Sequence, residues 1–546
     1  MTDIPVLIVG AGPVGLSAAV FLADHGVPAM VVERHAGTSV DPKMRVVSPR
    51  VMELYRAVGM EDAIRAVRSP IADHTVVAHA ETVAGPERHR VPTGILDGYE
   101  NLSPCAWGSI DQDQLEPVLL EHARRLGVEV RFNTTLVGLT ENPDSVTALV
   151  RDSVGEREYQ VSTDHLVAAD GVYSTVRSIM GIPQHGPGVL RRLISVHFRA
   201  DLREQMRERR VIALSVRNSE VQGALVPVDG DRRWRFSIRV ADGESTADYP
   251  EERCVRLLEA AIGVPGLPLV IERVSDGLWD FRTEVAERMR VGRVFVAGDA
   301  AHVMPPGGAF GAATGIQDAC NLAWKLAMVH RGVAGESLLD TYESERLPVA
   351  LETSREATER YQAAQGMGQC KPTTASLYRV FFGYVYREGA FLGEPGGDPE
   401  AWEDPENPSG RPGTRAPHVV VEHDGCQVST LDLVGTGFAL FAGPAATGWA
   451  EAADEVARRF DVRLPCYQVG HDLRDPSGDL LRHYGIGRKG AALIRPDGFV
   501  AWRTVDSPAP TDTLTDVLAR VLHHPVGSTP STPVTRSVPR PTGVPG

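Results

Sequence analysis

The sequence of 546 residues is poor in cysteine and lysine and has no long hydrophobic run. Its six cysteines are far apart and include no C-x-x-C pair, which argues against a disulfide framework, a zinc site or a dithiol redox centre. Glycine, proline or charge interrupts every apolar stretch well short of the ~20 residues that span a bilayer. The first residues, MTDIPVLIVG, carry an acid and a proline where a secretory signal carries basic residues, so we expect a cytoplasmic protein.

The chain also lacks positive charge. Its formal net charge is -15 and it contains no long basic run, so neither nucleic acid nor a membrane surface is an expected partner. The hydrophobic and charged fractions, 42% and 23%, are those of a globular protein and exclude disorder over most of the length. A chain of this length is expected to fold into two to four domains and can enclose a large cofactor.

The first strong pattern is a strand, a glycine turn, a helix and a second strand at the N-terminus. The turn GAGPVG places Gly10, Gly12 and Gly15 at G-x-G-x-x-G spacing. The first glycine permits a tight turn, the second lets the backbone approach a pyrophosphate, and the third lets helix and strand pack closely. Glu33, at the end of the second strand, can bind ribose hydroxyls. The pattern predicts a dinucleotide site and fits NAD and FAD equally.

A second glycine-rich loop lies far downstream in VFVAGDAAHVMPPGGAFGAATG. Asp299 follows a strand there, where a carboxylate can hydrogen-bond the ribitol or ribose hydroxyls of a ligand that lies across the sheet. The helix that begins near Gly315 would favour negative charge at its start, as on a reduced flavin, by ~1 kcal/mol. NAD is too short to need both loops, whereas FAD is long enough, so the two loops together predict one FAD.

The pattern of polar and apolar residues divides the chain into parts. An α/β pattern extends to about Arg177, and stretches such as LISVHFRAD and RWRFSIRVA then alternate between apolar and polar residues, which predicts an inserted antiparallel sheet. The strand-then-glycine pattern returns at 292, and mainly helical sequence follows from 335 to 393. Residues 393–417 are dense in proline and glycine and are expected to form a linker or a long surface connection.

Three segments in this order resemble the FAD-dependent aromatic hydroxylases of the p-hydroxybenzoate hydroxylase fold: GAGPVG with VVER, ADGVYSTVR, and GRVFVAGDAAHVMPP. Other segments, among them MRVVSPRVMELYR, FFGYVYREGAF and RHYGIGRKGAALIRPDGFVAWRT, are similar to polyketide hydroxylases of the aklavinone-11-hydroxylase type. The resemblance implies an α/β protein with a Rossmann-like FAD-binding domain. It further implies an inserted antiparallel sheet that holds the substrate and a C-terminal thioredoxin-like α/β domain without redox cysteines, which would serve packing or homodimerisation. The expected boundaries are an FAD-binding domain with a helical extension (1–187 and 280–400), the inserted sheet (188–279), the thioredoxin-like domain (418–524) and a disordered tail (525–546).

The resemblance also implies the cofactor contacts. The positions that match FAD ligands of the family are Gly10, Gly12, Pro13, Gly15, Glu33, Arg34, Arg45, Gln112, Leu136, Asp170, Gly298, Asp299, Pro306 and Gly311. NAD(P)H is implied as a co-substrate that binds transiently without a Rossmann domain of its own, and the choice between NADH and NADPH stays open. The chain departs from the family at Ala309, where glycine is usual, at Ala313 for asparagine and at Cys320 for histidine. These changes are expected to remove a flavin contact or to remodel a backbone position that needs positive φ.

The implied reaction is oxygen insertion into a phenol. NAD(P)H reduces FAD, O2 adds to give a C4a-hydroperoxide, and the electron-rich ring of a polycyclic aromatic polyketide attacks its distal oxygen. The candidate catalytic residues are Arg387, Tyr386 and Tyr384 in GYVYREG, a segment that related hydroxylases place near substrate. The competing interpretation makes the tyrosines core aromatics and Arg387 a solvated helix end. His302 is expected to order its loop, and Cys320 to be a small core residue.

Several alternatives stay open at this point. Baeyer–Villiger cleavage or epoxidation of a polyketide ring would use the same scaffold, and an altered flavin loop could leave a structural or regulatory flavoprotein. A flavin halogenase is disfavoured because no W-x-W-x-I-P segment occurs, and a plain NAD-dependent dehydrogenase is disfavoured most. His197, Arg217, Arg235 and Arg239 belong to the inserted sheet, but the sequence does not say which face of that sheet meets the substrate.

Overall fold

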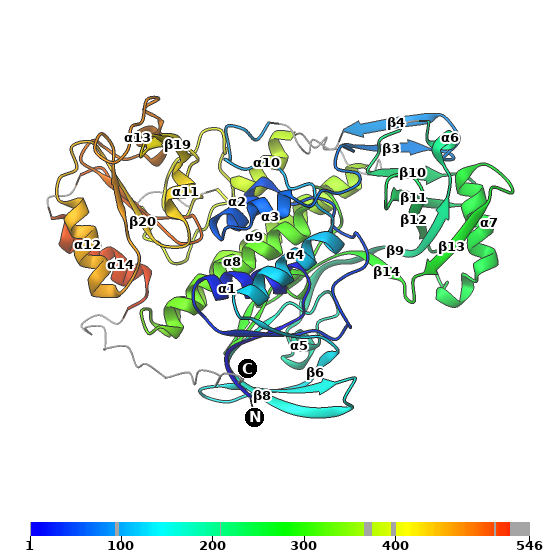
Figure 1. The fold of residues 1–546 in the computed structure, drawn as a ribbon, viewed down its shortest axis with the longest axis horizontal. Helices are drawn as coiled ribbons and strands as arrows, with labels where there is room; N and C mark the ends of the chain where they lie inside the picture. The colour runs from blue at the N-terminus through cyan, green and yellow to red at the C-terminus, as the bar shows by residue number, and fades with distance from the viewer. Residues whose placement is uncertain are drawn as a thin grey trace, which may run out of the picture.

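The computed structural model describes residues 2–92, 98–207, 209–364, 374–394, 400–506 and 509–524. Figure 1 shows three lobes in a row. A central lobe of helices and sheet carries the N-terminal part of the chain, a second sheet with helix α7 (Glu251–Ile262) lies on the right, and the C-terminal part forms the lobe on the left. The predicted tail over 525–546 lies outside the described residues.

The central lobe is built on an eight-stranded sheet with the path β15, β16, β8, β1, β2, β5, to which β6 and β7 are joined. Strands β16, β8, β1, β2 and β5 run parallel to one another, so their carboxyl ends share one edge. The strands are β1 (Thr2–Val9), β2 (Ala29–Val32), β5 (Glu129–Arg131), β6 (Thr134–Glu141), β7 (Val146–Asp152), β8 (Arg157–Ala168), β15 (Arg290–Val291) and β16 (Val294–Val296). The predicted Rossmann-like fold of this lobe is confirmed.

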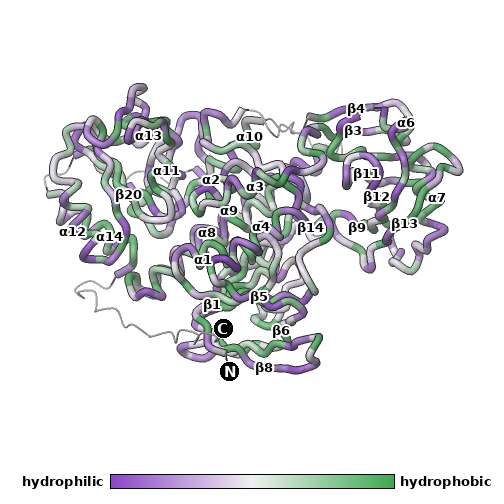
Figure 2. Tube along the Cα trace, viewed as in Figure 1, coloured by the Kyte–Doolittle hydropathy of each residue, from purple (hydrophilic) through white to green (hydrophobic). Residues whose placement is uncertain are grey.

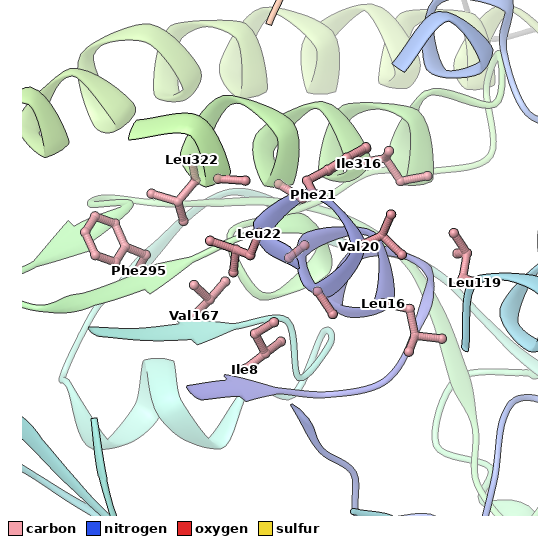
Figure 3. Close-up of a cluster of buried hydrophobic side chains, with 14 of the residues drawn as sticks. Ile8, Leu16, Val20, Phe21, Leu22, Leu119, Val167, Phe295, Ile316 and Leu322 are labelled. Carbon is pink, nitrogen blue, oxygen red and sulfur yellow. The ribbon is translucent and has the colours of Figure 1, made fainter. Parts of the chain in front are cut away.

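Helices cover the parallel sheet, and local sequence explains how they start. Pro13 opens α1 directly after Gly12, as proline does at the first helical position, and a capping box of Asp111 and Gln114 opens α4. Figure 3 shows side chains of α1 packed between Ile8 and Val167 of the sheet and residues of α8 such as Ile316. The helices are α1 (Pro13–Asp24), α2 (Pro49–Ala57), α3 (Glu61–Arg65), α4 (Gln112–Arg125), α5 (Thr175–Ile179), α8 (Phe310–His330), α9 (Asp340–Ala364) and α10 (Thr374–Phe382), with the 3-10 turns η2 (Gly298–Ala300) and η3 (Glu336–Leu339).

Helix α8 is apolar almost all round because it lies in the middle of the molecule, between α1 and the C-terminal lobe. Its length and hydrophobicity do not make it a membrane span: within the described ranges, no helix is long and apolar enough to cross a bilayer.

The second lobe is a nine-stranded sheet with the path β17, β14, β9, β12, β11, β10, β3, β4, and β13 beside β9. Both purple and green stretches occur in this lobe in Figure 2, and polar and apolar residues alternate in the strand RWRFSIR, as expected for a sheet with one buried face. That face, which includes Val196, Phe198 and Phe236, packs against Leu258 of α7. The elements are β3 (Val76–Ala80), β4 (Glu87–Pro92), β9 (Gln184–Ala200), α6 (Arg203–Met206), β10 (Ala213–Arg217), β11 (Gln222–Pro227), β12 (Arg233–Arg239), η1 (Thr246–Asp248), β13 (Leu269–Val274), β14 (Trp279–Ala286) and β17 (His302–Val303).

This sheet is wider than the predicted range 188–279. Strands β3 and β4 come from much earlier in the chain, and β3 pairs in parallel with β10. Strand β17 comes from the segment between Asp299 and the flavin loop. The sequence of β4, ERHRVP, is strongly polar, and nothing local to β3 and β4 reveals that β3 pairs with a strand more than a hundred residues away. Only the assembled sheet identifies these segments as part of the second lobe.

The C-terminal lobe contains a four-stranded mixed sheet in the order β21, β20, β22, β23, with helices on both faces. Strands β20 and β21 are parallel, whereas β22 is antiparallel to both β20 and β23. The elements are β18 (Val420–His423), β19 (Cys426–Ser429), α11 (Thr430–Val434), β20 (Ala439–Ala442), α12 (Trp449–Phe460), β21 (Cys466–Gln468), α13 (Asp479–Tyr484), β22 (Ala491–Ile494), β23 (Val500–Thr504) and α14 (Pro510–Val521).

The expected linker over 393–417 is not a surface connection along its whole length. Thr414 and Arg415 are buried, and the guanidinium of Arg415 donates to Glu53 of α2 and to the carbonyl of Leu102 at 2.9 Å. Part of this proline- and glycine-rich stretch therefore packs between the central lobe and the C-terminal lobe. Residues 395–399 lie outside the described part of the chain.

Candidate functional site

Three loops meet at the carboxyl edge of the parallel sheet. Gly10 follows β1, Asp170 follows β8 and Gly298 follows β16, and these strands are neighbours in the order β16, β8, β1. Backbone hydrogen bonds hold the loop starts side by side, from the Ala169 amide to the Val9 carbonyl at 2.8 Å and from the Ala297 amide to the Ala168 carbonyl at 2.9 Å. The three sequence segments that resemble the hydroxylase family thus form one edge, where open α/β sheets bind their ligands.

The first and third loops touch directly. A Cβ atom placed on Gly298 would lie 2.8 Å from the side chain of Val14, and one on Gly315 would lie 2.6 Å from Val14 and 2.7 Å from the Gly298 Cα. Real side chains do not approach so closely, so glycine is required at both positions. The two glycine-rich loops therefore converge at one place, as the interpretation of a single long ligand requires.

The glycines of the first loop differ in what surrounds them. A Cβ on Gly10 would lie 2.3 Å from the Ala169 carbonyl oxygen, and one on Gly15 would lie 1.9 Å from the Gly10 carbonyl oxygen. At Gly12 a Cβ would meet nothing within 4 Å. Gly12 precedes Pro13 at the start of α1, and no side chain caps that helix end. The open space and free N–H groups at this end suit the pyrophosphate of a dinucleotide.

The carboxylate of Glu33 lies beside the same loop. It accepts a hydrogen bond from the Ala11 amide at 2.8 Å and approaches Nδ1 of the exposed His35 at 2.6 Å. The neighbouring Arg34 is exposed. The Thr134 amide donates to the Glu33 carbonyl at 2.8 Å, which brings the start of β6, and with it Leu136, to this end of the sheet.

Two carboxylates at the edge keep unused hydrogen-bonding capacity. Asp170 accepts from the Val176 amide at 3.1 Å through one oxygen, while its other oxygen is buried without a partner. Asp299 is accessible and has no hydrogen-bond partner in the described part of the chain, yet the surrounding protein desolvates it and raises its pKa. A buried oxygen without a partner, like that of Asp170, is costly unless a polar ligand meets it, and the accessible Asp299 is free to bind one. Together with the open side of Gly12, they fit the ribitol and phosphate groups of FAD.

Arg177 fastens the second loop to the third. Its guanidinium donates to the Ala300 carbonyl and to the Val172 carbonyl, both at 2.9 Å. Burial lowers the pKa of Arg177, and its guanidinium donates to backbone carbonyls. Arg177, the last residue of ADGVYSTVR, therefore holds the second and third loops together.

Asp318 is a residue that the sequence-based prediction missed. It is fully buried on α8 and accepts from Nε of Arg346 at 2.8 Å and from the Gly298 amide at 3.2 Å, and it lies 2.6 Å from Nε2 of His302. Burial alone would raise the pKa of Asp318, but His302 and Arg346 outweigh it and lower the pKa. The expected role of His302 in ordering the loop agrees with this geometry. The sequence signal that could have identified Asp318 is an acidic residue in the middle of an otherwise apolar helix.

Other predicted cofactor contacts lie around this edge. The guanidinium of Arg45 donates to Asp111 at 2.7 Å and to the carbonyl of Pro227 in the second sheet. Gln112 donates to Glu116 at 2.8 Å. Arg45 thus joins the central lobe to the second sheet, while Gly311 lies in the first turn of α8 and Pro306 shortly before it.

The departure at Ala309 does not remodel the backbone. Ala309 has φ 61° and ψ 32°, so it keeps the left-handed conformation that glycine would favour, at the start of α8. Ala313 is buried and its carbonyl accepts from Gln317 at 3.0 Å. Cys320 packs against the hydrophobic core, where burial raises the pKa of the thiol to about 12. The loop is strained, and no thiolate is present beside it.

The predicted catalytic residues do not come together as a catalytic group. Tyr384 donates to Gln317 at 2.5 Å, and Arg346 donates to the hydroxyl of Tyr386 at 3.2 Å. Both tyrosines are buried, and burial, followed by the neighbouring Tyr384, raises the pKa of Tyr386 well above its usual value. Arg387 is exposed. Burial thus keeps the Tyr386 hydroxyl protonated at neutral pH, and the catalytic role of the three residues stays a prediction.

Tyr386 belongs to a buried ionic junction between the central and C-terminal lobes, and the Tyr384 ring lies beside it at a centroid distance of 5.7 Å. Glu345 of α9 accepts from Lys325 at 2.8 Å and from the two Nη atoms of Arg495 at 2.7 and 2.8 Å. Arg495 also donates to Asp497, and all these side chains are buried. We use the name junction for Asp318, Lys325, Glu345, Arg346, Tyr386, Arg495 and Asp497.

The second sheet turns one face toward the central lobe. Strand alternation and pairing place Arg217, Arg235, Arg239 and His197 on the same face, opposite to the residues that pack on α7. The carbonyl of Pro227, at the end of β11, accepts from Arg45 and joins this sheet to the central lobe.

The glycine spacing of the first loop recurs at Gly485, Gly487 and Gly490. These residues lie between helix α13 and strand β22, the reverse of the strand-to-helix order of a dinucleotide loop. A Cβ on Gly490 would lie 2.0 Å from the Thr504 carbonyl oxygen, so close packing against β23 explains the glycine. The described residues contain no cluster of side chains able to hold a metal ion.

Family models match most of the chain. A model described as an FAD binding domain matches residues 3–357, and one described as the C-terminal domain of aromatic-ring hydroxylases matches residues 409–525. The second match falls on the C-terminal lobe, and the first spans the central lobe and the second sheet.

Individual relatives agree with these models. A tetracenomycin A2 monooxygenase-dioxygenase of Streptomyces glaucescens is 40% identical over 529 residues, which cover 92% of this chain and 93% of the relative. A 4-methyl-5-nitrocatechol 5-monooxygenase of a Burkholderia species is 38% identical over 544 residues, with coverage of 95% and 98%. A crystal structure of aklavinone-11 hydroxylase with FAD and aklavinone superposes with a TM-score of 0.89 at 37% identity, covering 96% of this chain and 99% of that one. The chain therefore belongs to the family of FAD-dependent aromatic-ring hydroxylases.

Proposed function

We propose that the protein uses NAD(P)H and O2 to hydroxylate a phenolic ring of a polycyclic aromatic polyketide, with FAD bound along the carboxyl edge of the parallel sheet. The observation that carries the proposal is the convergence of three loops at this edge, next to an arginine-bearing face of the second sheet. The names of the tetracenomycin and aklavinone enzymes support the polycyclic substrate class.

The residues at the edge have distinct proposed roles. The backbone around Gly12 and the start of α1 hold the pyrophosphate, Glu33 holds the ribose of the adenosine, and Asp299 holds the ribitol. Asp170, with one unpartnered oxygen, lies between them. The remaining predicted cofactor contacts are Gly10, Pro13, Gly15, Arg34, Arg45, Gln112, Leu136, Gly298, Pro306 and Gly311.

When bound, FAD supplies the electron transfer and the activation of oxygen, and the protein supplies placement. The start of α8, approached through the strained Ala309, would lie against the flavin ring, where the helix end favours negative charge. Asp318 and Arg177 keep the loops of the edge in register through their bonds to Gly298 and Ala300. The opposing sheet face would exclude water from the ring that reacts.

The test uses the FAD-loaded protein with NADH or NADPH, oxygen and a panel of phenols from one to four fused rings. We expect the nicotinamide cofactor to be consumed faster with a polycyclic phenol, and a product with one added oxygen and an intact carbon skeleton by mass spectrometry and NMR. Lactone formation or ring opening would favour Baeyer–Villiger chemistry. Consumption that no phenol stimulates would contradict the proposed function and favour a regulatory flavoprotein.

A further inference from the structure

The face of β10, β11 and β12 that looks away from α7 carries a strip of small side chains. Ser215 pairs with Ala224, Ala224 with Ser237, and Ser237 with Ser195, so one row crosses four neighbouring strands. With strands ~4.8 Å apart, the row extends over about 14 Å. Trp279 donates to Ser195 at 2.9 Å and closes the row at β9. We call Ser215, Ala224 and Ser237 the strip.

Arginines bound the strip along the strand direction. Two residues to one side, Arg217 pairs with Gln222, and Arg239 donates to Gln222 at 3.0 Å. Two residues to the other side, Arg235 pairs with both Val226 and His197. Four residues of strand separate Arg235 from Arg239, or about 13 Å, which is close to the length of three or four linearly fused rings.

The surroundings of Arg235 leave its charge unpaired. Its Nε is buried without a hydrogen-bond partner, and no carboxylate of the described residues forms an ion pair with it. The nearest charged groups are committed elsewhere: Arg45 pairs with Asp111 at 2.7 Å, and Arg273 holds Asp41 at 2.5 Å. Burial, aided by Arg45, lowers the pKa of Arg235 to about 10, so it stays charged at neutral pH.

An isolated buried guanidinium is expensive, because the protein gives up its hydration without gaining a partner. A ligand anion would supply that partner through charge-assisted hydrogen bonds. The other titratable groups near this position are Asp41 and His197, which lies 3.7 Å from Asp41. Neither forms an ion pair or a hydrogen bond with Arg235 in the described part of the chain, so its guanidinium keeps donors for a ligand.

We propose that the strip seats a planar phenol of three or four fused rings and that Arg235 binds an anionic oxygen, a phenolate or enolate, at one end of it. This inference rests on the proposed function and names the substrate-binding surface of the same site. Small side chains leave room for a flat ring system, and the cation favours the ionised and more electron-rich form of the phenol. A single-ring phenol would cover only part of the strip.

The experiment measures binding to the FAD-loaded full chain without NAD(P)H, so that no turnover occurs. The probes are 1,8-dihydroxyanthraquinone and 4-nitrocatechol, whose absorbance changes on ionisation. We expect Arg235→Gln to weaken binding of the anthraquinone roughly 10- to 100-fold and to raise the pH at which the bound probe ionises. The control is Arg233→Gln on the same strand, because Arg233 is exposed and pairs with Glu272. This control should change the binding less than threefold.

A second variant tests the strip independently of charge. Ala224→Leu should weaken the anthraquinone at least tenfold more than 4-nitrocatechol, since the added side chain would rise into the space for fused rings. Equal losses for both probes, or anthraquinone binding that Arg235→Gln leaves unchanged, would overturn the inference. So would loss of FAD instead of probe in Arg235→Gln, which would make Arg235 a cofactor residue. The proposed function fails separately, if no phenol stimulates NAD(P)H consumption by the unaltered enzyme.

Discussion

The cofactor edge and the junction are both polar, but their hydrogen bonding is opposite. At the edge, Asp170 has a buried oxygen without a partner, Asp299 has none in the described chain, and Gly12 faces open space. At the junction, Glu345 alone accepts from Asn321, Lys325 and Arg495 and from the Ala390 amide.

The comparison teaches how to separate a ligand site from a structural connection. Polar groups that the chain leaves unsatisfied are retained at a cost, which a ligand offsets, whereas a satisfied buried network already has its partners. Burial differs as well, because Asp299 is exposed whereas the charged side chains of the junction are fully buried. The hydroxyls of Tyr384 and Tyr386 have hydrogen-bond partners within the protein, whereas Nε of Arg235 has none in the described part of the chain.

The largest expected effect is at the junction. Glu345→Ala would leave Lys325 and Arg495 buried without their anion, so we expect the free energy of unfolding to fall by about 3–5 kcal/mol. Burial alone would raise the pKa of Glu345, but Arg495 and Lys325 outweigh it and hold the carboxylate ionised. Chemical denaturation of the FAD-loaded protein measures the loss. Glu352→Ala, on the same helix but paired only with the exposed Arg355, should cost at most ~0.5 kcal/mol. Similar losses in both variants would contradict a closed network.

A matched pair of glycine variants tests the edge. In Gly15→Ala the new Cβ would lie 1.9 Å from the Gly10 carbonyl oxygen, so we expect a loss of stability of about 1–3 kcal/mol or more. Gly12 has an ordinary φ of -75° and free space, so Gly12→Ala should unfold like the wild type without FAD. It should nevertheless bind FAD more weakly, as a fluorescence titration would show. If Gly12→Ala bound FAD with unchanged affinity, its backbone would not face the pyrophosphate.

Acid should destabilise the C-terminal lobe. His418 lies 2.8 Å from Ser429, and burial, aided by Arg415, lowers its pKa from 6.5 to about 4. Because the folded pKa is below the unfolded value, this contribution is complete above pH 6.5 and is lost as the pH falls toward 4. We expect a loss of about 1–2 kcal/mol over that window. His418→Leu lacks this titration, so the difference in unfolding free energy between the variant and the wild type should change between pH 7 and pH 5. A constant difference would contradict the assignment.

Tyr386→Phe distinguishes a structural from a catalytic tyrosine. Loss of the hydroxyl removes the hydrogen bond from Arg346 and should lower the unfolding free energy by about 1 kcal/mol. Turnover with a polycyclic phenol should fall less than tenfold, whereas removal of a general base typically costs ~10²–10⁴ in rate. A loss of that size in a folded, FAD-loaded variant would restore the catalytic role predicted from the sequence.

The smallest expected effect is a gain in stability. Ala309→Gly relieves a left-handed backbone that costs alanine about 1–2 kcal/mol, and the added freedom of the unfolded chain offsets part of this. We expect a net stabilisation of about 0.5–1 kcal/mol, measured as a higher melting temperature. Ala312→Gly, within α8, should have the opposite sign because glycine is unfavourable inside a helix. Destabilisation by both changes would mean that Ala309 is not strained.

Much of the cofactor site could be predicted from the sequence because its motifs are local. The turn at Gly10, Gly12 and Gly15 and the turn at Asp299 each combine a strand, a glycine and a helix start within a few residues, and the structure brings both turns together. Asp318 escaped notice because its partners, His302 and Arg346, are separated from it along the chain and only the folded core gathers them.

The sequence by itself determined the α/β class, the FAD-binding loops and the membership of the hydroxylase family, because these depend on contiguous patterns that adjacent residues set. Only the tertiary structure decided that β3 and β4 join the second sheet, that Tyr384 and Tyr386 hold two lobes together, and that Arg235 lacks an anion. Each of these depends on which distant side chains become neighbours. Whether a buried polar group has a hydrogen-bond partner depends on whether the folded chain brings a second polar group next to it.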